Sequence, residues 1–202
     1  MKNESPYKYR HEEDAYYTHQ PVLMKALKIS TGDVLELGCG DGSTELIHRF
    51  CEVHDRKIVT AESDSAWLSK YKDKFSSEKH SFILTDKWGE FSKKMSERRW
   101  GLVFIDQGNW QGRAESFLAL RDCADYLILH DCDYFYENGL LGSPNEPHWK
   151  DVIANSKEFQ PIKRLCWTDP PLRKLTGPPT LLASNIHSCE IHVDFSLKEE
   201  SL

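Results

Sequence analysis

The chain has 202 residues, of which 26 are basic and 32 acidic, and its formal net charge at pH 7 is -6. This length suits one domain that buries roughly 70% of the surface its unfolded form exposes, so neither disulfides nor structural metal ions are needed for a core. The charges form no block of one sign and no apolar run is long enough to span a bilayer, which argues against nucleic-acid and membrane partners.

The N-terminus is polar and aromatic and lacks the apolar segment of a signal peptide, so we expect a cytoplasmic protein. The 6 cysteines are scattered without a C-x-x-C pair. Such scatter is typical of reduced thiols inside cells rather than of a disulfide framework. The sequence leaves the oligomeric state open and is compatible with a homodimer.

Short apolar runs alternate with amphipathic stretches between residues 33 and 129, which predicts repeated βα units and a parallel sheet. The runs are short enough to be strands buried on both faces. Helices are predicted at residues 20–29, 44–53, 65–75, 88–97 and 113–124. Strands are predicted at residues 34–37, 57–61, 81–84, 102–105 and 126–129.

The rhythm changes after residue 131. Residues 138–147 are rich in turn formers and predict a loop, which a helix at residues 148–156 follows. Two further strands are predicted at residues 161–166 and 179–183. Residues 189–195 alternate between apolar and polar side chains, which predicts an edge strand or an extended tail. We expect the last residues, 198–200, to be a frayed and solvated end.

A glycine-rich turn lies between the first predicted strand of the sheet and the helix that follows it, in the segment VLELGCGDGST at residues 34–44. Glycines at alternate positions, Gly38, Gly40 and Gly42, let the backbone bend sharply and approach a ligand closely. A dinucleotide-binding turn needs glycine or alanine at position 43, where this chain has Ser43. The turn therefore disfavours pyrophosphate and favours a ligand whose ammonium group and ribose hydroxyls take carboxylate partners.

Carboxylates of this kind follow the second and third predicted strands. Glu62 ends the second strand, where an acidic side chain can accept hydrogen bonds from both ribose hydroxyls. Asp86 follows the third strand in the same way, within reach of an adenine amino group. The alternative for each residue is a solvated carboxylate at a strand end.

The glycine turn with its leading acid Glu36, followed by Glu62 and Asp86, resembles the signature of class I S-adenosylmethionine-dependent methyltransferases. The resemblance covers about residues 20–134. It implies S-adenosylmethionine as the cofactor and a three-layer Rossmann-like α/β fold, with a seven-stranded, mostly parallel sheet and helices on both faces. It places the turn around the methionine moiety, Glu62 on the ribose and Asp86 near the adenine. The residues implied around the cofactor are Glu36, Gly38, Cys39, Gly40, Gly42, Ser43, Glu62, Ser63, Asp86, Lys87, Trp88 and Asp106.

Asp106 and the pair His130-Asp131 follow the fourth and fifth predicted strands and are the candidate catalytic residues. Ligands of open parallel sheets bind outside the carboxyl ends of the strands. Two carboxylates there can hold a hard cation such as Mg²⁺, with Asp106, Asp131 and Asp133 as oxygen ligands, or one of them can act as a general base. His130 is the best single proton acceptor, because its ordinary pKa is about 6.5. The alternative for His130 is a histidine hydrogen-bonded under the end of the sheet.

The segments Phe104-Ile105-Asp106 and Leu129-His130-Asp131 resemble the branch of small-molecule and sugar O-methyltransferases, several of which use a metal ion. The chain departs from that branch at Gln107-Gly108-Asn109, where the branch usually has a second Asp and a His. The resemblance implies methyl transfer to a hydroxyl of a small polar acceptor.

We expect a single methyltransferase domain over residues 1–202. Residues 1–30 form an N-terminal lid and helix, residues 31–131 the cofactor-binding core, and residues 132–202 the acceptor-side loop, the last strands and the tail. Two other functions stay open: a Rossmann-like oxidoreductase or hydroxylase on the same scaffold, and a non-catalytic module that binds S-adenosylmethionine.

Overall fold

The computed structural model describes residues 6–108, 110–132, 165–168, 180–189 and 191–202. The strands of its main sheet are β2 (Val34–Leu37), β3 (Ile58–Glu62), β4 (His80–Leu84), β5 (Trp100–Ile105), β6 (Ala124–His130), β7 (Leu165–Thr168) and β8 (Thr180–Ala183). The helices are η1 (Ala15–Tyr17, a 3-10 helix), α1 (Gln20–Ile29), α2 (Thr44–Val53), α3 (Ser65–Phe75), α4 (Trp88–Met95) and α5 (Trp110–Leu120).

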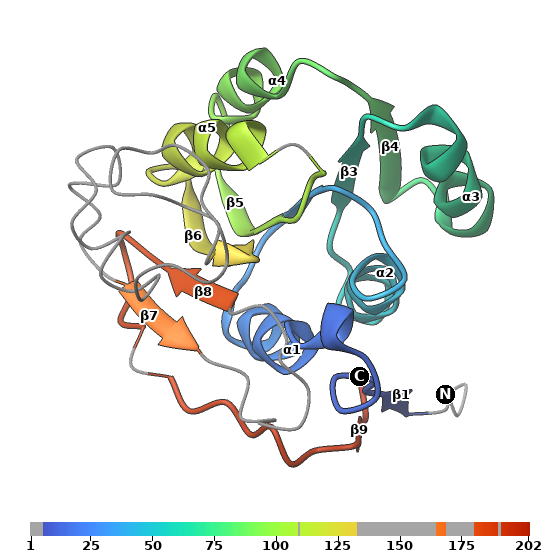
Figure 1. Ribbon diagram of the computed structural model, residues 1–202, viewed down its shortest axis with the longest axis vertical. Coiled ribbons are helices and arrows are strands. Elements are labelled where there is room, and N and C mark those ends of the chain that lie inside the picture. Colours follow the sequence, from blue (N-terminus) through green and yellow to red (C-terminus); the bar gives the residue numbers. More distant parts are fainter. Residues whose placement is uncertain (1–5, 109, 133–164, 169–179, 190) are drawn as a thin grey trace.

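The main sheet has seven strands in the order β4-β3-β2-β5-β6-β8-β7, with helices on both faces (Figure 1). Strands β2 to β6 pair in parallel, whereas β8 pairs antiparallel with both β6 and β7. The three-layer, mostly parallel Rossmann-like fold expected from the sequence is confirmed. None of the helices in the described ranges combines the length and the apolar character that crossing a membrane requires.

The strand order reverses between β2 and β5. In open α/β sheets a ligand binds at this point, in the crevice outside the carboxyl ends of the strands. The register pairs Leu37 with Ile105, so the residues that follow the two strands, Gly38 and Asp106, are neighbours. The fold therefore brings the glycine turn beside the acid that ends β5.

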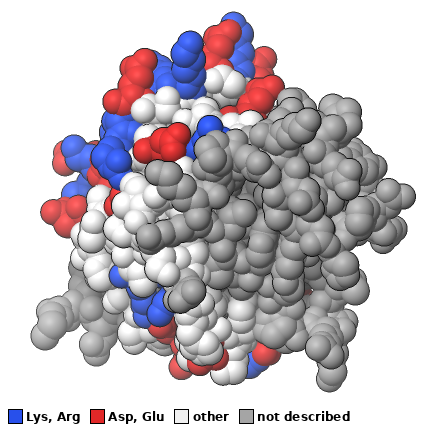
Figure 2. Space-filling model, turned by 90° about the vertical axis from the view of Figure 1, so that its left-hand side faces the viewer, with Lys and Arg blue, Asp and Glu red and all other residues white. Residues whose placement is uncertain are grey.

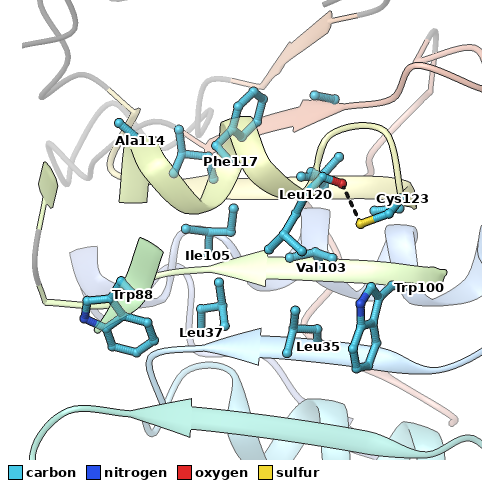
Figure 3. Close-up of a cluster of buried hydrophobic side chains, with 14 of the residues drawn as sticks. Leu35, Leu37, Trp88, Trp100, Val103, Ile105, Ala114, Phe117, Leu120 and Cys123 are labelled. Carbon is cyan, nitrogen blue, oxygen red and sulfur yellow. Dashed lines mark hydrogen bonds between the residues drawn. The ribbon is translucent and has the colours of Figure 1, made fainter. Parts of the chain in front are cut away.

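Both faces of the central strands are buried, which explains their continuous apolar sequences. On one face, Leu35 and Leu37 of β2 and Ile105 of β5 pack with Trp88 and Phe117 from the covering helices α4 and α5 (Figure 3). On the other face, α1 and α2 cover residues such as Val34 and Phe104. Trp88 and Phe117 are 3% and 0% exposed, so this layer is closed to solvent.

The two ends of the described chain form a second, two-stranded sheet of β1 (Tyr7–Lys8) and β9 (Glu199–Glu200). The Tyr9 hydroxyl donates a hydrogen bond to the Glu200 carboxylate at 2.6 Å. The prediction of a frayed end at residues 198–200 is therefore wrong. Strands of two residues have no periodicity to detect, and the pairing partner of β9 lies at the far end of the sequence.

Most predicted boundaries agree with the structure within a few residues, and α1, α2, α3 and β2 agree at both ends. The fifth predicted helix, 113–124, is shifted: α5 spans residues 110–120, because residues 121–123 turn and β6 already begins at Ala124. The described residues of 189–195 form no strand. The predicted loop at 138–147 and helix at 148–156 lie outside the described residues.

Basic and acidic side chains are interspersed on the described part of the surface that Figure 2 presents, at the end of the molecule where α4 lies. Lys87, just before α4, and Glu90 of α4 form such a pair, with 3.8 Å between the ammonium nitrogen and the carboxylate. Such mixed charge gives no extended basic field, the feature that phosphate backbones require.

The N-terminal segment is fastened to the glycine turn by the buried side chain of Gln20, the first residue of α1. Its amide oxygen accepts the Arg10 backbone N–H at 2.7 Å. Its amide nitrogen donates to the Tyr7 hydroxyl at 2.8 Å and to the Gly42 carbonyl at 3.0 Å. Three polar groups from three segments thus share one buried partner.

The substitution Gln20→Met keeps the side-chain volume and removes all three hydrogen bonds. We expect the free energy of unfolding to fall by about 2–3 kcal/mol, because buried polar groups lose their partner. Denaturant titration measures this change. The control Lys25→Met lies on the same helix and should change stability by less than about 0.5 kcal/mol. Equal stabilities of the two variants would contradict the assignment.

Candidate functional site

The three glycines of the turn have different atoms next to them. Gly38 has φ +88°, and a Cβ there would lie 2.5 Å from the backbone oxygen of Asp106. A Cβ at Gly42 would lie 2.6 Å from the ring of Tyr17. At Gly40 a Cβ would meet no atom within 4 Å. Gly38 and Gly42 therefore allow other parts of the protein to pack closely against the turn. The sequence predicted a close approach of the ligand at all three glycines, but of the three only Gly40 has open space beside it.

Glu36 stands behind the turn, fully buried, and joins the elements on either side of it. Its carboxylate accepts hydrogen bonds from the hydroxyls of Ser43 at 2.7 Å and Thr44 at 3.0 Å, next to the start of α2. It also accepts one from the Thr60 hydroxyl of β3 at 2.7 Å. Burial raises the pKa of Glu36 to about 7, although these hydrogen bonds oppose the rise. Glu36 thus braces the turn from inside the protein.

The hydrogen-bond network behind Glu36 continues across the sheet to the surface. The Thr60 hydroxyl lies 2.8 Å from Nε2 of His80, and the Nδ1 atoms of His80 and His48 are 3.1 Å apart. Burial lowers the pKa of His80 to about 3, so this imidazole is neutral near physiological pH. A continuous row of polar groups therefore connects the base of the glycine turn with His48 of α2.

Glu62 lies beside the turn, as predicted for the acid that ends the second strand. Its carboxylate accepts the backbone N–H groups of Cys39 at 3.2 Å, Ser63 at 2.6 Å and Asp64 at 3.0 Å. The indole of Trp67 donates to the Cys39 carbonyl at 2.6 Å and covers the outer side of the turn. The ribose contact expected of Glu62 stays a prediction.

The predicted residues after the third strand lie in a separate hollow. Asp86, Lys87 and Trp88 line it together with Gly112 and Glu115, and its volume is about 350 Å³. The Trp88 indole itself packs into the core (Figure 3), where a Cβ on Gly112 would press against it. The contact with adenine expected here also stays a prediction.

A cavity of about 420 Å³ joins the glycine turn to the ends of β5 and β6. Its volume is within the range of small-molecule sites, about 300–1,000 Å³. The N-terminal segment closes one side of it. The lining residues are Asp14, Tyr16, Tyr17, His19, Gly40, Asp41, Gly42, Ser43, Trp67, Asp106, Arg113, His130 and Asp131.

The three predicted catalytic residues meet in this cavity, and Arg113 of α5 holds them together. The guanidinium of Arg113 lies 2.8 Å from Asp106 and 2.9 Å from Asp131. The Nδ1 atom of His130 lies 3.2 Å from the Asp106 carboxylate and 3.4 Å from that of Asp131. Asp131 adopts φ +54°, a conformation costly for residues other than glycine and common where a site constrains the backbone. Asp133 lies outside the described residues.

The charges in this cluster stabilise one another. Burial opposes ionisation of Asp106, but His130 and Arg113 outweigh it and hold the pKa of Asp106 below its usual range. Burial also opposes a proton on His130, but the carboxylates of Asp106 and Asp131 outweigh it and raise the pKa of His130. The cluster can therefore accept a proton at His130 without leaving an isolated charge in the protein.

Two members of the site were missed by the sequence reasoning. Arg113 was assigned only to a helix, and nothing in its local sequence distinguishes it from a surface arginine. His19 precedes α1 and is 2% exposed, with its ring centroid 4.4 Å from that of His130. The only sequence signal for His19 is a histidine just before an amphipathic helix. Its place in the site depends on how the N-terminal segment docks on the sheet.

Comparison with known proteins supports the fold through structural similarity at low sequence identity. No protein-family model matches the chain, and no curated protein matches it in sequence. Among solved structures, the chain is similar to Methanococcus jannaschii fibrillarin, a pre-rRNA processing protein, with a TM-score of 0.58 and 12% identity over 91% of this chain and 83% of that one. It is also similar to a Podospora anserina methyltransferase bound to S-adenosylhomocysteine (SAH), with a TM-score of 0.56 and 15% identity over 91% and 90%.

A third similar structure is a spermidine synthase in complex with the transition-state analogue AdoDATO, with a TM-score of 0.53 and 18% identity. The match covers 85% of this chain and 59% of the synthase chain. At these identities the likeness is one of fold: the chain shares the Rossmann-like architecture of class I methyltransferases and related enzymes.

The different neighbours of the glycines can be tested with a matched pair of substitutions. Gly38→Ala should lower the free energy of unfolding by at least about 2 kcal/mol, because it strains a left-handed backbone and forces a methyl group against β5. Gly40→Ala should change it by less than about 0.5 kcal/mol. Thermal and denaturant unfolding measure both. Equal destabilisation would show that the contact with β5 does not restrict position 38.

The raised pKa of Glu36 predicts a stability that depends on pH. The folded protein binds a proton at Glu36 up to about pH 7, whereas the unfolded chain loses it near 4.5. The contribution of Glu36 is therefore present below pH 4.5 and is lost as the pH rises through 7.

The substitution Glu36→Gln removes this titration. Its unfolding free energy, relative to the natural protein, should rise by about 3 kcal/mol from below pH 4.5 to above pH 7. Denaturant titrations across this range give the difference. Parallel stability curves for the two proteins would show that folding does not change the pKa of Glu36.

Proposed function

We propose that the chain transfers the methyl group of S-adenosylmethionine to a hydroxyl of a small polar acceptor. One observation carries this proposal: a single cavity contains both the glycine turn, open at Gly40, and the buried cluster of Asp106, His130 and Asp131. The first part suits a nucleoside ligand without phosphate, and the second suits removal of a proton. The fold shared with an SAH-bound methyltransferase supports the same conclusion.

The residues around the turn fit this cofactor. The open space at Gly40 accepts a ligand against the backbone, and the cavity supplies the aromatic rings of Tyr17 and Trp67 beside it. Glu36 would keep the turn in shape from behind. We further propose that Glu62 and Asp86 hold the ribose and the adenine, as their positions at the ends of β3 and β4 suggest.

The cofactor supplies an activated methyl group, and on transfer the acceptor oxygen gains a bond to carbon while the carbon–sulfur electron pair goes to sulfur. The chain must exclude water, align the acceptor and take the hydroxyl proton. Alignment alone can contribute about 7–11 kcal/mol to lowering the barrier. The 3-10 helix η1, which ends at Tyr17, covers the cavity from the N-terminal side. Asp106 and Asp131 stabilise the positive charge that forms when the proton arrives at His130.

A small polar acceptor suits the size and the chemistry of the cavity. Aspartates, histidines and tyrosine hydroxyls line it. The cavity also has to hold the cofactor, so little of its volume is left for the acceptor. We expect neither nucleic acid nor membrane as a partner, since the described surface has mixed charge, and we expect the enzyme to act in the cytoplasm.

The first experiment is calorimetric titration of the purified chain with SAH. We expect one molecule bound per chain. Methyl transfer from labelled S-adenosylmethionine across a library of polar metabolites then identifies the acceptor. In His130→Gln we expect kcat to fall by about 10²–10⁴, the usual contribution of proton transfer, with unchanged SAH affinity.

Three results would contradict the proposal. Absence of SAH binding to the natural protein rules out the cofactor. Binding of SAH without methylation of any acceptor indicates a non-catalytic module. A bound flavin, nicotinamide requirement or oxygen-dependent product indicates an oxidoreductase or hydroxylase on the same scaffold.

A further inference from the structure

Three side chains that favour metal ions converge at the inner end of the cavity. His19 comes from the segment before α1, Asp106 from the end of β5 and His130 from the end of β6. One potential ligand atom of each lies within 4.8 Å of the others. The three belong to segments far apart in sequence, and within the described ranges no other group of His, Cys, Asp and Glu converges in this way.

Three buried ring nitrogens in this cluster lack a hydrogen-bond partner. Both ring nitrogens of His19 and Nε2 of His130 are buried and make no hydrogen bond. A buried polar group without a partner costs about 1–3 kcal/mol, so such groups usually have a ligand or an ion to bind. Both imidazoles are 2% exposed, and His19 is held in place between Gly42 and the ring of Phe104. The surrounding side chains therefore restrict both rings to small movements.

The local charge favours a cation. Asp106 and Asp131 carry two negative charges, and the Arg113 guanidinium between them carries one positive charge. The two carboxylates and the guanidinium together carry a net charge of about -1, which a bound cation would offset. Arg113 is 5% exposed and contacts both carboxylates, so it orders the acidic groups.

We propose that His19, Asp106 and His130 bind a divalent transition-metal ion. Two imidazoles and one carboxylate suit Zn²⁺, Fe²⁺ or Co²⁺, whereas Mg²⁺ prefers oxygen ligands alone. The Nδ1 atom of His130 lies 3.2 Å from the Asp106 carboxylate, so these two ligand atoms face one position from which an ion could contact both. Ligand atoms of one ion stand no more than about 4.2 Å apart at a bond length of about 2.1 Å, so small side-chain rotations close the site.

This site differs from the one expected from the sequence, which used Asp106, Asp131 and Asp133 around Mg²⁺. Here Asp131 is the partner of Arg113 and His19 replaces it as a ligand. Asp106 is 25% exposed and faces the cavity, so an acceptor hydroxyl could reach the ion there and lose its proton more readily. With the ion bound, the Asp131 carboxylate in the same cavity would take this proton in place of His130. This use of the ion depends on the proposed function, but the binding of the ion does not.

The test uses the full chain, freed of metal by dialysis against a chelator and titrated with Co²⁺. Imidazole-bound Co²⁺ has visible absorption bands, and calorimetry gives the stoichiometry and affinity. We expect one Co²⁺ per chain, displaced by Zn²⁺. In His19→Gln the affinity should fall by more than about 100-fold, since a ligand matters more than its supporting residues. The control His192→Gln, at an exposed histidine of the C-terminal segment, should bind Co²⁺ normally.

Two further measurements keep the result unambiguous. Circular dichroism and thermal unfolding check that His19→Gln is folded. X-ray absorption of the Zn²⁺-loaded natural protein counts its ligands independently of any variant, and we expect two imidazole nitrogens. Absence of Co²⁺ binding, equal affinity in the natural protein and folded His19→Gln, or a zinc spectrum without two imidazoles would overturn the metal site.

Titration with SAH on the same preparations separates this inference from the proposed function. A protein that binds SAH but not Co²⁺ has no metal site and can still be a methyltransferase. A protein that binds Co²⁺ but not SAH has the metal site and a different function.

Discussion

The site depends on the contact between the ends of β2 and β5, where Gly38 lies against the backbone of Asp106 with no room for a side chain. This contact fixes the glycine turn relative to the acid that ends β5. It also explains why the two parts of the cavity are next to each other, because parallel pairing extends as far as Leu37 and Ile105. Glu36 maintains the turn from the interior, where its three hydroxyl partners connect α2 and β3.

A second constraint comes from α5, which places Arg113 between the ends of β5 and β6. The guanidinium contacts Asp106 and Asp131 and also donates to the His130 carbonyl at 2.9 Å. Two carboxylates this close would repel each other, and a buried counter-charge makes their approach favourable. Folding of the helix onto the sheet therefore assembles the acidic residues and aligns His130 in the same step.

The sequence alone predicted the sheet, most of the helices and the convergence of Asp106, His130 and Asp131. These features follow from local patterns: buried parallel strands are continuously apolar, and strand ends carry polar residues. The sequence could not show His19, Arg113 or the pairing of β1 with β9, because each depends on which distant segments pack together. The glycines illustrate the same limit: the pattern identified the turn, but only the structure separates Gly38 and Gly42, which face protein, from Gly40.

The pairing of β1 with β9 connects the C-terminal segment, through the N-terminal segment, with the cavity. Glu200 bonds to Tyr9, the neighbouring Tyr7 bonds to Gln20, and Gln20 reaches the carbonyl of Gly42. Three hydrogen bonds and the contact between the rings of Tyr7 and Tyr9 thus connect residue 200 with the wall of the cavity. Residue 200 therefore supports, through the N-terminal segment, a cavity that none of its own atoms lines.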